Sequence, residues 1–321
     1  MLPKAELHVH LEGTATPDLI RRLARRNGLE PPEGLFAAPD RFAWDGFLGF
    51  LAAYDRAASV IRTGEDYRDV TYEYLVACAA DGVIYVELTA SRDHARLVGL
   101  TDAEHWEGIA RGIDDAREQH GIEARILSSA VRNFGVAQAL DVAREAASRP
   151  HPYVVGFSMA GDEAGFPPTQ FAEAYAVAAA AGLGCTVHAG EWAGAESVRA
   201  ALELPVTRIG HGVRAIEDQS LVAELARRGI VLEVCPTSNV ALGVFGSYEE
   251  HPLGDLRAAG VPVTLGSDDP PYFGASAAGE YEVARRHFGL RDDELRAITR
   301  TAVDASFAEP DLKAALRERV G

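Results

Sequence analysis

Short runs of hydrophobic residues alternate along the chain with longer segments of mixed polarity. The runs are rich in Val, Ile and Leu, as expected of β-strands, and lie at residues 5–11, 84–91, 123–131, 154–161, 184–190, 208–213, 231–239 and 261–270. Segments with helical spacing lie between them, at residues 17–27, 65–81, 102–120, 136–148, 169–181, 197–202 and 216–228. Strands that alternate with helices predict βα units and a parallel sheet.

Eight strands, each followed by a helix, predict a (β/α)8 TIM barrel in which residues 1–321 form a single domain. The sequence has no Pro/Ser-rich linker or low-complexity tract that would divide the chain. The alternative is an open doubly wound sheet, whose dinucleotide-binding form carries Gly-x-Gly-x-x-Gly after its first strand. Here the first strand ends in His-Leu-Glu-Gly-Thr at residues 10–14, which disfavours nicotinamide chemistry.

A helical insertion is expected after the first strand. Residues 28–54 are long for a βα connection and contain Phe42, Trp44, Phe47 and Phe50. Such an aromatic segment can form an apolar lid over the barrel mouth. It can equally belong to the core, because aromatic residues at helical spacing usually do, and the sequence favours neither alternative.

The composition describes a soluble globular protein, with 47% hydrophobic and 25% charged residues. The 31 basic and 48 acidic residues give a net charge of −17, which disfavours nucleic acid as a partner. The first residues do not resemble a secretory signal, and the apolar stretch at residues 175–187 is too short to span a membrane. Three scattered cysteines disfavour a disulfide framework, so we expect a cytoplasmic protein.

Four histidines lie at or near predicted strand ends, where barrel enzymes hold their reactive groups. His8 and His10 are two residues apart, so an extended strand points both imidazoles to the same side. His188 and His211 follow in the fifth and sixth strands, and Asp268 ends the eighth. A single strand-end histidine can bond a backbone carbonyl, and Asp-Asp-Pro can form a turn. The coincidence of these groups at four strand ends favours a metal site.

Three imidazoles and one carboxylate form a ligand set for one divalent ion per chain. Zinc matches these ligand types best and leaves a position for water. Zinc lowers the pKa of its bound water towards neutrality, so hydrolysis is the expected reaction. The predicted ligands are His8, His10, His188 and Asp268.

Three further polar residues near these ligands remain for proton transfer and recognition: Glu191, His211 and Asp269. Glu191 stands three residues after a predicted ligand and can lie beside the metal without binding it. A partly dry pocket would raise the pKa of its carboxyl group, which suits it to donate a proton to a ring nitrogen. A structural carboxylate at a helix N-terminus is the alternative for this residue.

Six short motifs follow one another over nearly the whole chain. They are Ala-Glu-Leu-His-Val-His-Leu-Glu-Gly at 5–13, Met-Ala-Gly-Asp-Glu at 159–163, Thr-Val-His-Ala-Gly-Glu at 186–191, Gly-His-Gly at 210–212, Glu-Val-Cys-Pro-Thr-Ser-Asn at 233–239 and Ser-Asp-Asp-Pro at 267–270. Together they resemble the adenosine deaminase branch of the amidohydrolase superfamily. The resemblance implies a zinc-bearing (β/α)8 barrel of the metal-dependent hydrolase type, which hydrolyses the 6-amino group of a purine and releases ammonia.

The resemblance also implies a role for each residue of the predicted site. Glu191 would protonate N1 of the purine, and His211 would orient and deprotonate the attacking water with help from Asp268. Asp269 would contact N7, and Gly161 would meet N3 through its backbone N–H, because a residue without a side chain permits close approach. The four residues expected to contact the substrate are His10, Glu12, Gly161 and Asp269.

Two motif positions bear on the substrate. The family's nucleoside enzymes have Asp in place of Glu12, where it touches the 5′-hydroxyl of the sugar, and the longer Glu12 would crowd this contact. Glu at this position is common in relatives with other substrates, including free adenine and 5′-substituted nucleosides. The Gly161-Asp-Glu motif is nucleoside-type, whereas adenine-specific relatives usually carry Ser-Ser-Glu. We therefore expect a purine nucleoside substrate, either adenosine or a 5′-modified analogue such as aminodeoxyfutalosine. Arg92 is a candidate cation for an acidic substituent.

Two alternatives to a nucleoside deaminase remain. The first is a deaminase of free adenine. The second, of another class, is a catalytically inactive family member that acts as a binding protein. It is disfavoured because no metal or proton-transfer position is substituted. In either enzyme the expected partner is a small purine, and neither nucleic acid nor a membrane is expected.

Overall fold

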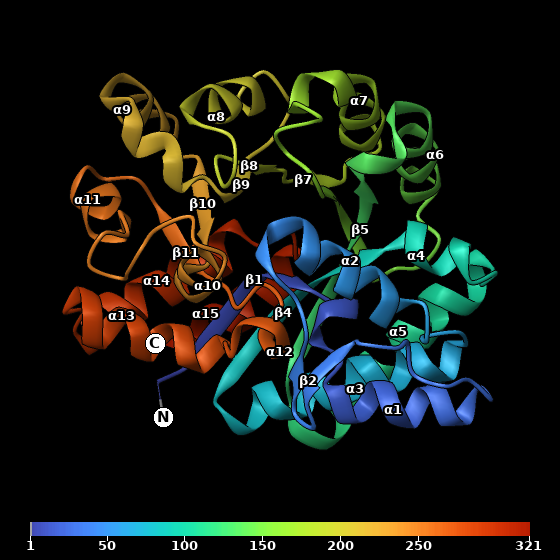
Figure 1. The fold of residues 1–321 in the computed structure, drawn as a ribbon. Helices are drawn as coiled ribbons and strands as arrows, with labels where there is room; N and C mark the ends of the chain where they lie inside the picture. Colours follow the sequence, from blue (N-terminus) through green and yellow to red (C-terminus); the bar gives the residue numbers. More distant parts are fainter. Residues whose placement is uncertain (1) are drawn as a thin grey trace.

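Parallel strands form the centre of the molecule in the computed structural model, which describes residues 2–321 (Figure 1). They make one sheet in the order β1-β4-β5-β6-β7 and a second in the order β11-β10-β9-β8. β7 and β8 are consecutive halves of the fifth barrel strand. The bounds are β1 Lys4–His10, β4 Val83–Ser91, β5 Glu123–Val131, β6 Val154–Ala160, β7 Gly184–Cys185, β8 His188–Ala189, β9 Arg208–His211, β10 Val231–Val234 and β11 Val263–Leu265.

Backbone hydrogen bonds join the two sheets at both edges. At one edge the N–H of His10 donates to the carbonyl of Asp268 at 2.9 Å, and the N–H of Asp268 donates to the carbonyl of His8 at 3.1 Å. At the other edge the fifth strand bonds both neighbours, because Thr186 N–H donates to the Phe157 carbonyl and the Val187 carbonyl accepts from Gly210 N–H. The predicted eight-stranded (β/α)8 barrel is therefore confirmed.

Helices surround the barrel and follow its strands (Figure 1). Two of the longest begin with a capping box, in which Thr63 pairs with Asp66 and Thr101 with Glu104. The helices are α1 Pro17–Arg26, α2 Gly46–Ala58, α3 Gly64–Ala80, α4 Arg92–Leu97, α5 Asp102–His120, α6 Val136–Ala147, α7 Ala172–Ala180, α8 Ala195–Ala201, α9 Gln219–Arg228, α10 Pro236–Ala241, α11 Leu253–Ala258, α12 Pro270–Phe273, α13 Ala277–Phe288, α14 Asp292–Ala305 and α15 Pro310–Val320. The 3-10 turns are η1 Glu12–Thr14, η2 Arg132–Phe134, η3 Pro168–Phe171 and η4 Val213–Glu217.

The late strands are shorter than the sequence predicts. The run at residues 231–239 is a strand only to Val234, because Pro236 has no N–H for the ladder and instead starts α10. The run at residues 261–270 is a strand only over β11, and Pro270 starts α12. Motif residues that the hydrophobic pattern assigned to strands thus lie in the turns above the barrel.

The insertion after the first strand serves both expected purposes. It contains a hairpin of β2 Phe36–Ala38 and β3 Arg41–Phe42, followed by α2, which crosses the front of the barrel in Figure 1. Phe42 and Phe50 are buried in a hydrophobic cluster. Phe47, Phe50 and Tyr54, on one face of α2, also line a cavity at the barrel mouth. The insertion therefore belongs to the hydrophobic core and also covers the cavity at the barrel mouth.

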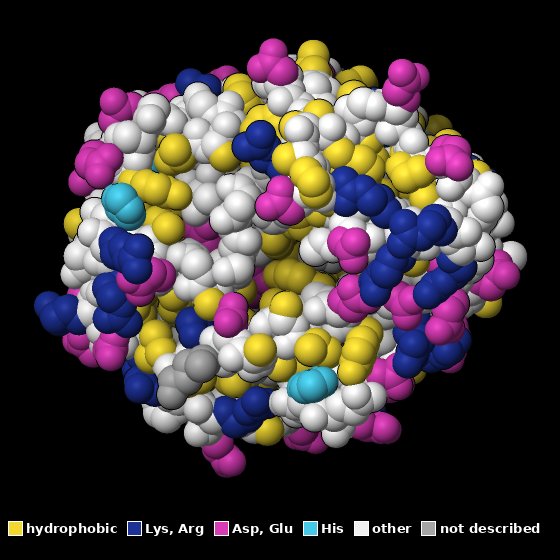
Figure 2. Space-filling model, turned by 60° about the horizontal axis from the view of Figure 1, so that its bottom comes forward, with side chains coloured by type: hydrophobic (Ala, Val, Ile, Leu, Met, Phe, Trp, Pro, Cys, Tyr) yellow, Lys and Arg dark blue, Asp and Glu magenta, His cyan; other side chains and the backbone are white. Residues whose placement is uncertain are grey.

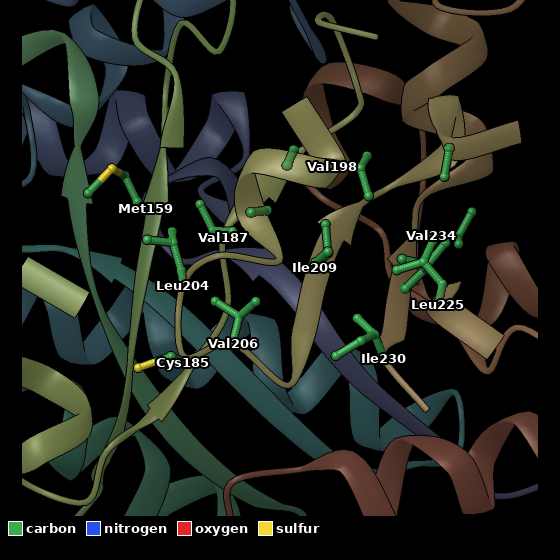
Figure 3. Close-up of a cluster of buried hydrophobic side chains, with 14 of the residues drawn as sticks. Met159, Cys185, Val187, Val198, Leu204, Val206, Ile209, Leu225, Ile230 and Val234 are labelled. Carbon is green, nitrogen blue, oxygen red and sulfur yellow. The ribbon is translucent and has the colours of Figure 1, made fainter. Parts of the chain in front are cut away.

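A hydrophobic core fills the space between the strands and the surrounding helices. In Figure 3 Val187, Ile209 and Val234 of the barrel wall lie in one cluster with Val198 of α8 and Leu225 of α9. All five are buried. This packing between barrel wall and helices holds the strand ends in place, which positions the polar residues that follow them.

The surface of the molecule carries both signs of charge. Figure 2 shows a face on which acidic and basic side chains are interspersed and hydrophobic side chains gather around a central hollow. Among residues 2–321, no helix has the length and apolar character needed to cross a membrane.

Candidate active site

The four predicted metal ligands lie together at the barrel mouth. His8 and His10 belong to β1 and His188 to β8, while Asp268 lies three residues beyond the end of β11. One ligand atom from each lies within 4.8 Å of the others. His10 Nε2 is 3.1 Å from His188 Nε2 and 3.3 Å from Asp268 Oδ1. The structure therefore brings together all four residues that the sequence singled out.

Two residues of the site have an unusual backbone conformation. His211 and Asp268 have φ angles of 58° and 62°, a left-handed conformation that is uncommon for residues with a side chain. The two backbone bonds to β1 described above hold Asp268 in place. Gly266 permits this close approach, since a Cβ there would lie 2.6 Å from the carbonyl oxygen of His8. Such strain persists only where surrounding contacts enforce it, and it is concentrated at functional sites.

The donor atoms of the cluster fit a cation. His8 Nε2 is buried and has no hydrogen-bond partner among residues 2–321. His10 Nε2 and His188 Nε2 face each other, although two neutral imidazoles can share only one proton there. A metal ion satisfies these lone pairs together, and three imidazole nitrogens with one carboxylate oxygen form a set suited to a borderline divalent ion.

The ring of His8 is oriented from behind by Glu233. Its Nδ1 donates to Glu233 Oε2 at 2.9 Å, which leaves Nε2 for a metal. Glu233 is in turn held by Thr186 Oγ1 at 3.0 Å and by Arg208 Nε at 2.6 Å. Burial lowers the pKa of His8, but Asp268 and Glu233 outweigh it and raise that pKa to about 10. The carboxylates thus favour a positive charge at this point.

Sequence reasoning assigned no role to Glu233 or to two other residues of the quoted motifs. Ser238 Oγ donates to Asp268 Oδ2 at 2.6 Å and so fixes the outer carboxylate oxygen. Glu163 accepts hydrogen bonds from the backbone N–H groups of residues 190–193, including Glu191 N–H at 3.1 Å. The only sign of a functional role in the sequence was that these residues belong to the motifs. Their contacts could not be predicted, because they form only when the barrel is closed.

Glu191 and His211 lie beside the four predicted ligands, and burial shifts the pKa of each in the direction that the predicted chemistry needs. Burial, together with Asp268 and Glu163, raises the pKa of Glu191 well above its usual range, which favours the protonated carboxyl group. Burial lowers the pKa of His211 to about 3, so its imidazole is neutral. His211 Nε2 lies 3.6 Å from Glu191 Oε2 and 4.0 Å from Asp268 Oδ2.

Gly161 and Asp269 also line the cavity. Gly161 has a φ of 106°, and a Cβ there would lie 2.4 Å from Asn133 Oδ1, so only glycine fits this position. Burial and the neighbouring Asp268 raise the pKa of Asp269 well above its usual range. The raised pKa favours the protonated form of Asp269, whose O–H can donate to a ring nitrogen.

The cavity itself is small. It encloses about 80 Å³, whereas pockets for drug-sized ligands measure roughly 300–1,000 Å³. Its polar wall comes from the strand ends and its apolar wall from α2. The polar wall includes His10, His188, Glu191, His211, Asp268 and Asp269.

Glu12 lies behind the cavity wall and is absent from its lining. Its buried carboxylate accepts hydrogen bonds from Tyr54 OH at 3.2 Å, Tyr67 OH at 3.2 Å and Ser91 N–H at 3.0 Å. Asp55, the residue after Tyr54, lies 2.8 Å from His94 Nε2. Glu12 therefore fastens α2 over the cavity, with the Asp55–His94 pair as a second attachment.

Arg92 does not face the cavity, contrary to the expectation that it could bind an acidic substituent. It is 2% exposed, its Nε donates to Glu145 Oε1 at 3.1 Å, and its guanidinium also bonds the Leu100 carbonyl and Asp102. The hydrophobic pattern could not reveal this, because Glu145 lies 53 residues further along the chain, on α6.

Known proteins match this chain over its whole length. The family model described as adenosine deaminase matches residues 3–321. The chain is 49% identical over 321 residues to an adenine deaminase of Chelativorans sp. strain BNC1, covering 100% of this chain and 98% of the relative. The crystal structure of adenine deaminase from Arthrobacter aurescens superposes with a TM-score of 0.91 at 32% identity, covering 100% of this chain and 98% of that one. An amidohydrolase from Burkholderia ambifaria with bound zinc has a TM-score of 0.90 at 28% identity, covering 99% of this chain and 89% of that one.

Proposed function

Because this chain belongs to the adenosine deaminase family, we propose that it is a zinc-dependent adenine deaminase of one domain. In the proposed reaction, water attacks C6 of free adenine and the 6-amino group leaves as ammonia. The observation that carries this proposal is the 49% identity, over the full chain, to an adenine deaminase. The family and its solved members support a metal-dependent hydrolytic deaminase rather than an inactive binding protein.

The nucleoside substrate that the sequence motifs predicted is wrong. Three relatives that cover at least 99% of the chain, at 46–49% identity, are adenine deaminases. The Gly161-Asp-Glu motif is therefore not a reliable mark of nucleoside enzymes, and Glu12 was the more informative position. Adenosine and aminodeoxyfutalosine give way to the free base as the expected substrate.

The cavity supports a planar base as the occupant. Its volume of about 80 Å³ lies below the roughly 300–1,000 Å³ of pockets for drug-sized ligands, which favours a small ligand. Tyr54 and Asp55 of α2 stand in its wall. Tyr54 is fastened to Glu12 behind the wall, and Asp55 is fastened to His94, which also lines the cavity. A substituent at N9 that points towards α2 would have to displace side chains held by these bonds.

Each polar group of the cavity has a place in the proposed reaction. Glu191, whose raised pKa favours the protonated form, gives a proton to N1, which makes C6 more electrophilic. Asp269 and the Gly161 N–H orient the ring at N7 and N3. Burial alone would raise the pKa of Asp268, but the neighbouring imidazoles of His10, His8 and His211 hold it well below its usual range. Asp268 is therefore the ionised group that can accept a proton from water.

Zinc is the metal that we propose for the cluster of His8, His10, His188 and Asp268. When bound there, zinc would lower the pKa of a water molecule and so supply a nucleophile at neutral pH. The zinc-containing amidohydrolase among the solved structures supports this choice.

A substrate panel tests the proposal. The purified protein should contain about one zinc ion per chain by elemental analysis, and adenine should give the highest kcat/KM among adenine, 9-methyladenine and adenosine, measured as ammonia release. A higher kcat/KM for adenosine than for adenine would overturn the proposed substrate. Activity that survives complete metal removal would overturn the proposed mechanism.

A further inference from the structure

A line of hydrogen bonds leads from the backbone at the start of α11 to His211. The N–H of Leu253 lies 3.2 Å from Nδ1 of His251. Nε2 of His251 lies 3.1 Å from Oδ1 of Asn239, whose Nδ2 lies 3.2 Å from Nδ1 of His211. All four residues are buried, so water does not compete for these bonds.

The backbone end of this line determines the direction of every bond. A backbone N–H can only donate, so Nδ1 of His251 must accept and its ring proton must be on Nε2. Burial lowers the pKa of His251 to about 4, which keeps the ring neutral. Asn239 must then present its oxygen to His251 and its amide N–H to His211. Nδ1 of His211 consequently accepts from the amide, so the ring proton lies on Nε2.

The opposite arrangement would place two donors against each other. If Nδ1 of His211 carried the proton, Asn239 would have to turn its oxygen towards His211 and its amide N–H towards His251. His251 would then need its proton on Nδ1, where it would face the N–H of Leu253 without an acceptor. A buried pair of opposed donors is strongly unfavourable, so the line has one stable direction.

We propose that Asn239 and His251 are positioning residues that keep the proton of His211 on Nε2, so that this nitrogen faces the cavity as a hydrogen-bond donor. Nε2 of His211 lines the cavity side and has no hydrogen-bond partner within residues 2–321, so its N–H is free for a ligand. His211 then donates to the oxygen that adds at C6 and does not remove the proton of the water. The ionised Asp268 takes that proton.

This assignment changes the role that the sequence resemblance implied, in which His211 deprotonates the water. The kinetic part of the inference rests on the proposed function, because it concerns the oxygen that adds to adenine. The position of the proton on His211 does not, and it can be measured without substrate.

The first experiment is ¹⁵N NMR of the metal-loaded protein with ¹⁵N-labelled histidine. The His211 signals are identified by their loss in His211→Gln. We expect a protonated Nε2 and an unprotonated Nδ1 in the wild-type protein. A wild-type His211 with its proton on Nδ1 overturns the inference, whatever the substrate of the enzyme is.

The second experiment is the isosteric Asn239→Asp substitution. A carboxylate can only accept, so it should draw the proton of His211 to Nδ1 and leave Nε2 bare. We expect kcat for adenine to fall by about 10²–10³-fold, as when one donor to a developing oxyanion is lost, with the metal content unchanged. If His211 were the base, the new carboxylate would assist it as Asp assists His in a Ser-His-Asp triad, and a kcat that holds or rises would overturn the inference.

Two further variants separate the position of the proton from the added charge. Asn133→Asp adds the same charge near Gly161, away from His211, and should leave the His211 ¹⁵N spectrum unchanged. Asn239→Ala adds no charge, and we expect both His211 tautomers and a smaller fall in kcat. An Asn239→Ala protein with only the Nε2 proton and wild-type kcat would overturn the positioning role. A wild-type protein that does not deaminate adenine would overturn the proposed function but leave the NMR result standing.

Discussion

Glu280 on α13 is a buried carboxyl group whose environment should be visible in the stability of the protein. It is fully buried, its Oε2 accepts one hydrogen bond from Thr237 N–H at 3.3 Å, and its Oε1 has no partner in the described part of the chain. Burial raises the pKa of Glu280 from 4.5 to about 8. The folded protein therefore holds a neutral acid here at pH 7, while the unfolded chain holds a carboxylate.

The raised pKa determines the sign and size of the effect. Between pH 4.5 and pH 8 the folded state binds one more proton than the unfolded state, so stability falls as the pH rises. This loss of folding stability is absent below pH 4.5 and complete above pH 8. Each pH unit in this range lowers the free energy of unfolding by about 1.4 kcal/mol. The total loss is therefore about 2 kcal/mol at pH 6 and about 4 kcal/mol at pH 8.

Glu280→Gln removes this titration. Urea unfolding at pH 6 and pH 8 should show that the variant gains about 2 kcal/mol relative to the wild-type protein between the two pH values. Glu282→Gln is the matched control, because Glu282 lies on the same helix with its side chain 44% exposed. The difference in free energy of unfolding between Glu282→Gln and the wild-type protein should be the same at both pH values. A difference for Glu280→Gln that stays constant within about 0.5 kcal/mol would refute the buried neutral acid.

Four further predictions concern the site. His188→Ala should lose both the metal and the activity, and a variant with full metal content by elemental analysis would remove this residue from the ligand set. Glu191→Gln should keep the metal but lower kcat by about 10²–10⁴-fold, so near-normal turnover would exclude its proton transfer. Glu233→Gln should weaken metal affinity by about 10–100-fold in a chelator competition, and unchanged affinity would contradict its orienting role. Tyr54→Ala should raise the ratio of kcat/KM for 9-methyladenine to kcat/KM for adenine. The control is Tyr67→Phe, which loses a bond to the same Glu12 carboxylate outside the cavity and should leave this ratio unchanged. An unchanged ratio in an active Tyr54→Ala protein would show that α2 does not exclude N9 substituents.

The sequence predicts best those elements whose signals are local. Residues 102–120 match α5, because a capping box starts the helix and Gly121 ends it in the left-handed conformation. Residues 123–131 match β5, an almost wholly buried run that fits a strand covered on both faces. The pattern fails at residues 235–239, where apolar character continues past the strand while Pro236 turns the chain into a helix.

The proximity of the four proposed ligand residues was predictable for a related reason, and the residues that support them were not. His8 and His10 carry the spacing of a strand, and the remaining ligands occupy strand ends that the barrel topology brings together. Glu233 reaches His8 across 225 positions of sequence, and no local pattern encodes such a contact. The role of Glu12 was hidden in the same way, because Tyr54 and Tyr67 meet it from two separate helices.

The bonds between β1 and Asp268 that close the barrel have a consequence for the order in which the protein is made. The ligand set combines residues from the start of the chain, from its middle and from near its end. A ribosome must pass Asp268 before the set is complete, so the emerging chain offers only the two histidines of β1 and later His188. Joining the first strand to the last closes a loop of about 260 residues, at an entropic cost of about 5 kcal/mol. Metal binding to the proposed ligands would help to offset that cost, so we expect metal loading and the closing of the barrel to be coupled, late steps in the maturation of the chain.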